Sequence, residues 1–246
     1  MKAKVLAVIP ARYQSRRFPG KPLAFVGGKP ILQHIYNEAS KAKLIDRVVV
    51  ATDSDKIKSG VEGFGGEVVI TSKRHRTGSD RAAEVASKLG GDIILNIQAD
   101  HVGMNRQNYD SVLKKILADK NIRYASIVKK IEHETDLFDP NRVKVIFDSQ
   151  DNALWFSRYP LPYLQNINGD RLSTFKYYYH IGVYFFRRSA LDKFSRWTRS
   201  PLEKAESLEQ LRILENHEKI RLFKIKSRVL SIDTRDDLIK AESLLT

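Results

Sequence analysis

The sequence contains no cysteine among its 246 residues. This absence excludes disulfide bonds and metal sites built on thiolates, and it suits a protein of a reducing compartment. Long apolar runs are also missing. No stretch approaches the length that crosses a bilayer, and the apolar run at Val5–Ile9 is shorter than the core of a secretory signal. From these absences we expect a cytoplasmic protein that has no membrane partner.

Acidic residues are few relative to basic ones. The chain has 29 Asp and Glu against 43 Lys and Arg, which gives a formal net charge of +14. Such an excess indicates either a basic surface or an anionic partner: a nucleotide, an acidic sugar, a nucleic acid or a membrane face. The cations are spread along the chain with no long basic block, which weighs against nucleic acid. Hydrophobic residues make up 42% of the sequence, enough for a core, and we expect a single domain over residues 1–246.

Several common catalytic motifs are absent, including G-x-x-x-x-G-K-[ST], H-E-x-x-H and G-x-S-x-G. The start of the chain instead shows a short apolar strand that Pro10 is expected to end. Four cations follow in a loop: Arg12, Arg16, Arg17 and Lys21. The same loop contains the turn-forming residues Pro19, Gly20 and Pro22. Arginine forks and a lysine ammonium in a restrained loop are suited to phosphate oxygens. The segment predicts a triphosphate site, and a solvated basic loop is the alternative.

The rest of the chain alternates between strand and helix patterns. Apolar and β-branched runs predict strands over 5–9, 47–52, 67–71, 93–98, 123–131, 142–147, 153–158, 177–187, 220–226 and 229–232. Helices are predicted over about 30–42, 54–63, 79–89 with Ser79 as its cap, 105–120, 203–217 and 234–245. This alternation indicates an α/β fold with a mostly parallel central sheet and helices on both faces. The later strands extend the sheet or add a small subdomain.

Two aspartates follow strands of this predicted sheet. Ligands of an open α/β sheet bind at the carboxyl ends of the strands, where the loops 11–21, 71–81 and 99–103 should meet. Asp100 lies in the third of these loops, either as a turn residue or as a Mg²⁺ ligand. Asp233 is the candidate for a second carboxylate, because Thr234 and Asp237 form a capping box that leaves Asp233 without a capping role.

A family resemblance accompanies these features. The opening I-P-A-R-Y-Q-S-R-R-F-P-G-K-P-L resembles the signature of the CMP-KDO synthetases, the cytidylyltransferases that activate 3-deoxy-manno-octulosonate (KDO). The likeness continues in order along nearly the whole chain, at Val49–Asp53, Thr77–Arg81, Asn96–Asp100, Asn141–Val145, Ala153–Arg158, His180–Tyr184, Pro201–Glu203, Leu208–Arg212 and Asp233–Leu238.

The resemblance implies a Rossmann-like nucleotidyltransferase with a small dimerisation and sugar-binding subdomain. It implies a homodimer that uses CTP and Mg²⁺ to make a CMP-sugar for lipopolysaccharide biosynthesis. The implied nucleotide-binding residues are Ala11, Arg12, Lys21, Arg76, Gly78, Ser79 and Gln98. The implied residues for the acidic sugar are Gln98, Arg158, His180, Tyr184, Glu209 and Gln210. The implied metal ligands are Asp100 and Asp233, which with Arg12 and Lys21 form the catalytic set.

The sequence departs from the family pattern at four positions. Where the family reads Q-G-D-E-P, this chain has Ala99, His101 and Val102 around Asp100, and Arg235 replaces the proline of D-T-P. These departures leave the sugar open, with KDO or a relative such as 8-amino-KDO as candidates. Another nucleotidyltransferase, a glycosyltransferase of similar sheet plan and a non-catalytic nucleic-acid-binding protein are the alternatives.

Overall fold

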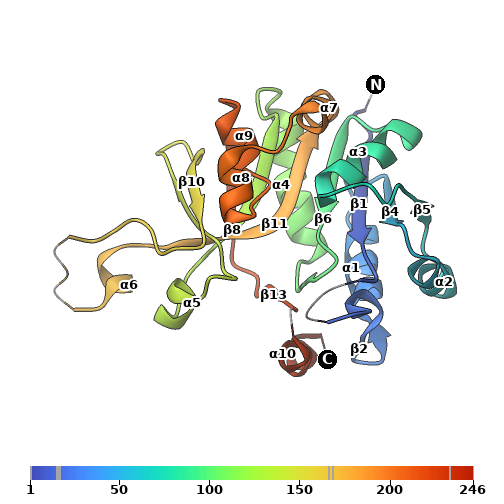
Figure 1. Ribbon diagram of the computed structural model, residues 1–246, viewed down its shortest axis with the longest axis horizontal. Helices are drawn as coiled ribbons and strands as arrows, with labels where there is room; N and C mark the ends of the chain where they lie inside the picture. The colour runs from blue at the N-terminus through green and yellow to red at the C-terminus, as the bar shows by residue number, and fades with distance from the viewer. Residues whose placement is uncertain (1, 15–17, 166, 168, 233, 246) are drawn as a thin grey trace. The chain divides into compact units, whose positions relative to one another are not determined.

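The computed structural model describes residues 2–14, 18–165, 167, 169–232 and 234–245, and the chain divides into two compact units (Figure 1). The first unit comprises Met1–Asn121, Val183–Ser195 and Ser227–Thr246, and the second comprises Ile122–Gly182 and Arg196–Lys226. Each unit has its own strands and helices. The expectation of a single domain over residues 1–246 stays a prediction.

Four parallel strands form the sheet of the first unit. They are β1 (Val5–Ala11), β4 (Arg47–Thr52), β5 (Val68–Ile70) and β6 (Ile93–Ile97), in the order β6-β1-β4-β5. Residues 183–187 of β11 (Tyr178–Arg187) run antiparallel beside β6. The side chains of Val5–Ile9 are at most 3% exposed, so this strand is buried on both faces, as its continuous apolar run predicts.

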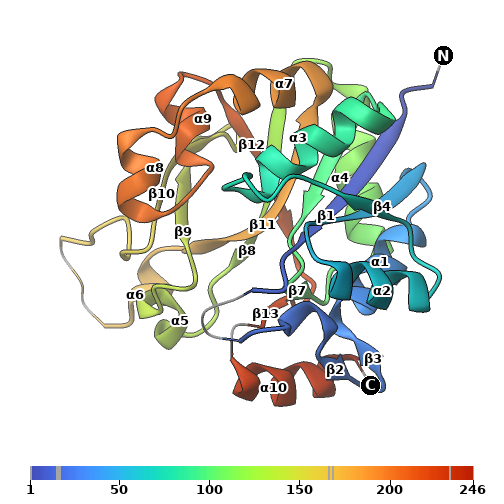
Figure 2. The ribbon, with the colours of Figure 1, turned by 45° about the vertical axis from the view of Figure 1, so that its right-hand side comes forward.

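Helices cover both faces of this sheet, as predicted. Six helices belong to the unit: α1 (Ile31–Ser40), α2 (Asp55–Gly63), α3 (Gly78–Leu89), α4 (Arg106–Ala118), α7 (Arg188–Arg196) and α10 (Arg235–Leu245). The chain steps in one direction from β1 to β4 to β5 and then returns to β6. Right-handed crossovers therefore place α1 and α2 on one face and α3 on the other. Figure 2 shows α3 in front of the strands and α4 behind them. No helix in the described ranges is long and apolar enough to span a membrane.

Small elements of the first unit that were not expected from the sequence are the 3-10 turn η1 (Lys21–Leu23), the hairpin of β2 (Phe25–Val26) and β3 (Lys29–Pro30), and the strand β7 (His101–Val102). The strand predicted over 229–232 is confirmed as β13 (Leu230–Ser231), which forms a two-stranded ribbon with β7. The prediction that Pro10 ends the first strand was wrong, because β1 continues to Ala11. Beyond Val8, β1 pairs only with β4, so a residue without an N–H is tolerated there.

The second unit contains two strand pairs joined through β11. β8 (Tyr124–Lys130) runs parallel to β12 (Ile220–Ile225), and β9 (Lys144–Phe147) runs antiparallel to β10 (Ala153–Ser157). Residues 178–182 of β11 lie between the pairs, next to β8 and β9. The turn between β9 and β10 is closed by the Asp148 carboxylate, which accepts the backbone N–H groups of Gln150 and Asn152 at 2.9 and 2.8 Å. The strands predicted over 142–147 and 153–158 are confirmed as the two strands of this hairpin.

The predicted helix over 203–217 was wrong, because the chain forms two short helices there. The first, α8 (Pro201–Glu206), is followed by Ser207, whose φ of 54° is left-handed. The second is α9 (Leu211–Glu215). Elsewhere in the unit, the described residues form two further short helices, α5 (Glu134–Phe138) and α6 (Arg171–Thr174). Glu203 and Arg212, at most 2% exposed, form a two-pronged ion pair with N–O distances of 2.7 and 2.6 Å. Residues nine apart in one helix are roughly 13.5 Å apart along its axis, so this pair requires the break.

Candidate functional site

The strand order reverses beside β1, and a cavity opens at that point. The connection from β1 leads to β4 on one side, whereas β6 lies on the other, so the loops after β1 and β6 separate. The cavity has a volume of about 320 Å³. Its lining includes residues from all three loops named in the sequence analysis: Arg12, Lys21, Arg76, Gly78, Gln98 and Asp100. The structure therefore brings these six candidate residues together within the first unit.

Lys21 and Asp100 form an ion pair in the wall of this cavity. Gly20, with a left-handed φ of 73°, donates its N–H to Tyr13 O at 2.8 Å and closes the first loop. The turn η1 then places Lys21 Nζ 2.8 Å from Asp100 Oδ2, while His101 Nδ1 lies 2.9 Å from Asp100 Oδ1. Burial acts to raise the pKa of Asp100, but the contacts with His101 and Lys21 together hold that pKa well below its usual range. The carboxylate stays ionised at neutral pH.

The backbone of Asp100 is held by the ribbon of β7 and β13. Ser231 lies opposite His101, and Ile232 donates its N–H to Asp100 O at 2.9 Å. Asp233, the second predicted carboxylate, follows Ile232 and lies outside the described residues. The predicted capping box at the start of α10 is present, because Thr234 and Asp237 exchange hydrogen bonds of 2.9 and 3.4 Å.

Among the described residues, Asp100 is the carboxylate that lines this cavity and could bind a divalent cation. In the described parts of the chain, no three His, Asp or Glu side chains gather as a metal cluster. Mg²⁺ commonly binds through one or two carboxylates, with phosphate oxygens and water completing its shell. An ionised aspartate beside a cavity lined by Arg12, Lys21 and Arg76 fits that mode of binding.

The N-terminus of α3 opens toward the same cavity. Its cap is Thr77, which exchanges hydrogen bonds of 3.1 and 3.2 Å with Asp80, so the prediction of Ser79 as the cap was wrong. Ser79 is fully buried inside the first turn, where its Oγ accepts a 2.9 Å hydrogen bond from Asn96. Gly78 lines the cavity, whereas Ser79 faces β6. The unpaired backbone N–H groups of a helix start attract anions.

The second loop is anchored by Glu84 on α3. Its carboxylate accepts the N–H of Ser72 at 2.9 Å and the ammonium of Lys88 at 2.6 Å, and it also contacts His75. Burial opposes ionisation of Glu84, but these contacts outweigh it and lower the pKa to about 2. Arg12 donates to the backbone carbonyl of His75 and so connects the first loop with the second.

Arg81 is a cavity residue that the sequence analysis named only as the last residue of the family-like segment Thr77–Arg81. Its side chain is 1% exposed, its Nη1 donates to Thr71, and its Nη2 lies 3.3 Å from Asp53 Oδ2 without the alignment of a hydrogen bond. Among the described residues Nη2 has no other hydrogen-bond partner. The sequence did contain a signal for the burial of Arg81. The residue is followed by the apolar residues Ala82 and Ala83, which are buried in α3.

The remaining first-unit candidates lie on strands or directly after one. Ala11 is buried at the end of β1, next to Arg12. Tyr184 is 5% exposed and lies opposite Asn96 in the pairing of β11 with β6. Gln98 lines the cavity, and its side-chain Nε2 donates to the side-chain Oδ1 of Asn96 at 3.4 Å. The nucleotide-binding and sugar-binding roles of these residues stay predictions.

His180 and Gln210 are neighbours inside the second unit. The Gln210 amide nitrogen lies 3.5 Å from His180 Nδ1 and can donate only to an unprotonated nitrogen. This assigns the proton to Nε2, which lies 2.7 Å from Ser126 Oγ, and that hydroxyl donates onward to Ile181 O at 3.3 Å. His180 is thus held in one orientation as a hydrogen-bonded ring.

Arg158 and Glu209 are the other second-unit candidates. Arg158 donates from Nε to Glu206 O at 2.8 Å and from Nη1 to Pro140 O at 2.9 Å, so its guanidinium is fixed by backbone carbonyls. Glu209 is half-buried in the turn between α8 and α9. Gln98 and Tyr184 belong to the first unit, so the six predicted sugar-binding residues are drawn from both units.

Comparison with known proteins identifies the family. A family model described as cytidylyltransferase matches residues 6–220. A 3-deoxy-manno-octulosonate cytidylyltransferase of Geobacter metallireducens is 42% identical, over 99% of this chain and 98% of its own length. This chain belongs to the 3-deoxy-manno-octulosonate cytidylyltransferase family. A second member of the family, from Pelobacter propionicus, is 42% identical over 96% of this chain and 95% of its own length.

A solved structure extends the family relationship to the fold. The CMP:2-keto-3-deoxy-manno-octonic acid synthetase complexed with CTP superposes with a TM-score of 0.90 at 35% identity. The match covers 99% of this chain and 98% of that one. The resemblance drawn from the sequence motifs is confirmed, and so are the nucleotidyltransferase class and the α/β fold with a mostly parallel sheet.

Proposed function

We propose that this chain transfers a cytidylyl group from CTP to the anomeric hydroxyl of KDO or a closely related acidic sugar, with release of pyrophosphate. The observation that carries the proposal is the cavity at the strand-order reversal, where the Lys21–Asp100 pair lies beside the start of α3. The relatives named above are KDO cytidylyltransferases, and the solved relative is described as bound to CTP.

The cavity supplies four kinds of donor to a triphosphate. Arg12 and Lys21 come from the first loop, the backbone N–H groups come from the start of α3, and the buried Nη2 of Arg81 lacks a hydrogen-bond partner among the described residues. A phosphate oxygen would accept a hydrogen bond from that nitrogen and add to the charge compensation that Asp53 Oδ2 already gives it at 3.3 Å. These donors would hold the triphosphate and stabilise the negative charge that develops on pyrophosphate.

The reaction forms one bond and breaks one. The anomeric oxygen attacks the α-phosphorus of CTP, the bond from that phosphorus to the β-phosphate oxygen breaks, and the hydroxyl proton leaves to solvent or a phosphate oxygen. Displacement at phosphorus depends mainly on in-line positioning and charge neutralisation. Arg12, Lys21 and Arg81 would fix the triphosphate, while Gln98, which lines the same cavity, would orient the sugar acid.

We assign the Mg²⁺ site to Asp100 together with Asp233. The support is the ionised Asp100 in the cavity wall and the ribbon of β7 and β13, which leads directly to position 233. Bound there, Mg²⁺ would neutralise phosphate charge and lower the pKa of the attacking hydroxyl. Turnover should stop when the metal is chelated with EDTA and return when Mg²⁺ is restored, and turnover that survives chelation contradicts the assignment.

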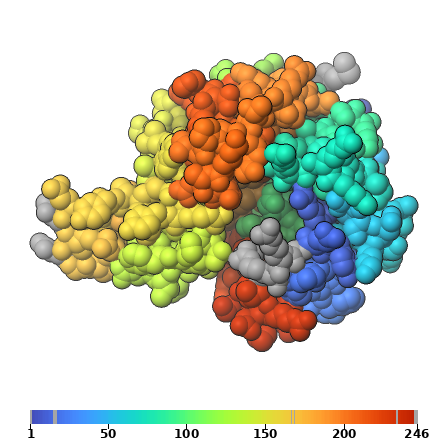
Figure 3. Space-filling view, in the orientation of Figure 1, coloured from blue at the N-terminus to red at the C-terminus, as the bar shows by residue number. Residues whose placement is uncertain are grey.

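A homodimer built through the second unit is part of the proposal. The segment after β10 carries large exposed aromatic side chains, with Tyr159 79% and Tyr163 84% exposed. Figure 3 shows this segment at the left margin of the second unit, open to solvent on the face in view. Exposed aromatics of this size are typical of protein interfaces. A monomeric mass in light scattering at micromolar concentration would refute the dimer. The cytoplasmic location and the role in lipopolysaccharide biosynthesis belong to the same proposal.

The decisive experiment is a panel of sugar acids with CTP, Mg²⁺ and a pyrophosphate readout. KDO and 8-amino-KDO form the two principal arms, and N-acetylneuraminate serves as a control of the same chemical class. We expect pyrophosphate release with KDO or its amino relative and little with the control. No release with any acid, or equal release with ATP and GTP in place of CTP, would overturn the proposal.

A further inference from the structure

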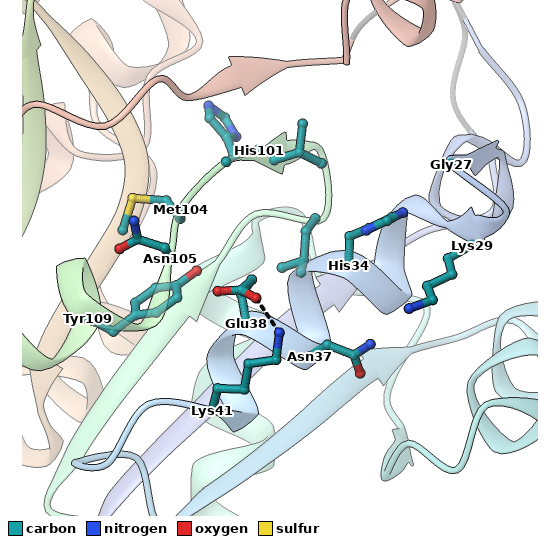
Figure 4. Close-up of a pocket in the computed structure, with 13 residues that line it drawn as sticks. Gly27, Lys29, His34, Asn37, Glu38, Lys41, His101, Met104, Asn105 and Tyr109 are labelled. Carbon is teal, nitrogen blue, oxygen red and sulfur yellow. Dashed lines mark hydrogen bonds and ion pairs between the residues drawn. The ribbon is translucent and has the colours of Figure 1, made fainter. Parts of the chain in front are cut away.

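A second cavity of about 430 Å³ lies in the first unit and shares no lining residue with the cavity described above (Figure 4). Its walls come from one face of α1, the chain that follows β7, the start of α4 and the hairpin of β2 and β3. The side chains that matter for the argument are Lys29, Glu38, Lys41 and Tyr109, together with the amides of Asn37 and Asn105.

The hydroxyl of Tyr109 is the unusual feature of this cavity. The residue is 0% exposed, and its hydroxyl has no hydrogen-bond partner among the described residues. Figure 4 shows this hydroxyl pointing toward the carboxylate of Glu38. Burial and the charge of Glu38 raise the pKa of Tyr109 above its ordinary value, so the group remains an O–H that can donate and accept. Buried polar atoms without a partner are rare and costly, and they call for an explanation.

The surrounding charges restrict what could pair with that hydroxyl. Glu38 accepts from Lys41 at 2.6 Å, which leaves carboxylate lone pairs for a further donor. A hydroxyl group, such as that of a sugar, can accept from Tyr109 and donate to Glu38 at the same time. Lys29 adds a second cation, so the two lysines outnumber the one acidic residue in the lining.

We infer that this cavity is a binding site for a small hydroxylated anion, a sugar phosphate or sugar carboxylate, one hydroxyl of which pairs with Tyr109 and Glu38 while its charge faces Lys29. The volume of about 430 Å³ lies within the range of roughly 300–1,000 Å³ that is typical of small-molecule sites. The site is separate from the nucleotide cavity and goes beyond the cytidylyl transfer proposed above.

Calorimetric titration with four probes tests the inference. Ribose 5-phosphate and gluconate carry both hydroxyls and charge, inorganic phosphate carries charge alone, and glucose carries hydroxyls alone. We expect at least one of the first two to bind the wild-type protein at least tenfold more tightly than phosphate or glucose. Tyr109→Phe should weaken that binding at least tenfold, whereas Tyr163→Phe, which changes an exposed tyrosine, should not. Binding at the nucleotide cavity would be insensitive to Tyr109→Phe, because Tyr109 does not line it.

Thermal denaturation without any probe provides the second measurement. If the hydroxyl lacks a partner in the free protein, Tyr109→Phe removes a buried unpaired group and raises the melting temperature, while Tyr163→Phe leaves it unchanged. A lowered or unchanged melting temperature for Tyr109→Phe would show a hydroxyl already paired, by a structural water for example, and would overturn the inference. Absence of binding by all four probes, or equal binding to the Tyr109→Phe variant and the wild type, would overturn it as well.

Discussion

Replacement of Gly78 by alanine tests the geometry of the cavity beside the start of α3. Gly78 is the first residue of α3, and a Cβ there would lie 3.3 Å from both Asn96 Nδ2 and Gln98 Nε2. Alanine restricts the unfolded chain and should contribute about 0.4–1 kcal/mol of stability by itself. Asn96 is fully buried and bonded to Ser79 at 2.9 Å, so it cannot retreat without stretching that bond. A buried amide that loses its partner costs about 1–3 kcal/mol.

The two terms oppose each other, and the net result for Gly78→Ala lies between no change and a loss of about 2.5 kcal/mol. Gly63 supplies the matched control. It is the last residue of α2, and an added Cβ would meet no atom within 4 Å. Gly63→Ala should therefore raise the melting temperature by about 1–4 °C, since about 1 kcal/mol corresponds to roughly 2–4 °C in a chain of this size.

The assay combines thermal denaturation with steady-state kinetics on the two variants. Gly78→Ala should displace the Gln98 amide in the cavity wall and lower kcat/KM for CTP about tenfold, which corresponds to about 1.4 kcal/mol. Gly63→Ala should leave kcat/KM unchanged. Equal stabilisation by both substitutions, with unchanged kinetics for Gly78→Ala, would refute the packing described around Asn96.

Three further predictions concern side chains described above. Asp100→Asn should keep the far-ultraviolet circular dichroism of the wild type and lower kcat at least 100-fold, or about 2.7 kcal/mol, because it removes the carboxylate charge from the cavity; near wild-type pyrophosphate release would contradict this. Arg212→Met removes the buried one of the two arginines that pair with Glu203 and leaves Arg199 Nε 3.2 Å from Glu203 Oε1, so it should cost about 3 kcal/mol in urea denaturation, the low end for a broken buried pair, whereas the exposed control Arg196→Met should cost less than about 0.5 kcal/mol. Glu84→Gln should lower the free energy of unfolding by about 1–2 kcal/mol at pH 7. The folded-state pKa of Glu84 is depressed to about 2, whereas the pKa in the unfolded chain is 4.5. The difference in unfolding free energy between the variant and the wild type should therefore persist above pH 4.5 and shrink as the pH falls from 4.5 toward 2. A free-energy difference that grows with acidification would disprove the role of the carboxylate.

The central strands could be predicted from the sequence because their signal is local. The β-branched run Arg47–Thr52 matches β4 residue for residue, and the other parallel strands differ from their predicted bounds by one or two residues. Parallel strands buried on both faces are continuous apolar runs, so their pattern does not depend on distant contacts. The convergence of the three loops followed from this topology alone.

Features that depend on distant partners escaped the sequence analysis. The break at Ser207 follows from the Glu203–Arg212 pair, and an amphipathic pattern cannot show that pair. Thr77 rather than Ser79 caps the helix, because the Ser79 hydroxyl accepts a hydrogen bond from the side chain of Asn96 on strand β6. Two-residue strands such as β7 have no periodicity, so their pairing was not visible in the sequence.

The ribbon of β7 and β13 has a consequence for the biosynthesis of the protein. Ile232 lies about 130 positions after Asp100, the residue whose carbonyl it binds. At about 5–20 residues per second, a ribosome needs roughly 7–26 s to travel between the two codons. For that interval the nascent chain already contains every parallel strand of the first unit, yet the Asp100 carbonyl has no partner from β13. The backbone of Asp100, a residue of the cavity wall, therefore gains this hydrogen bond late, when translation has passed the whole second unit.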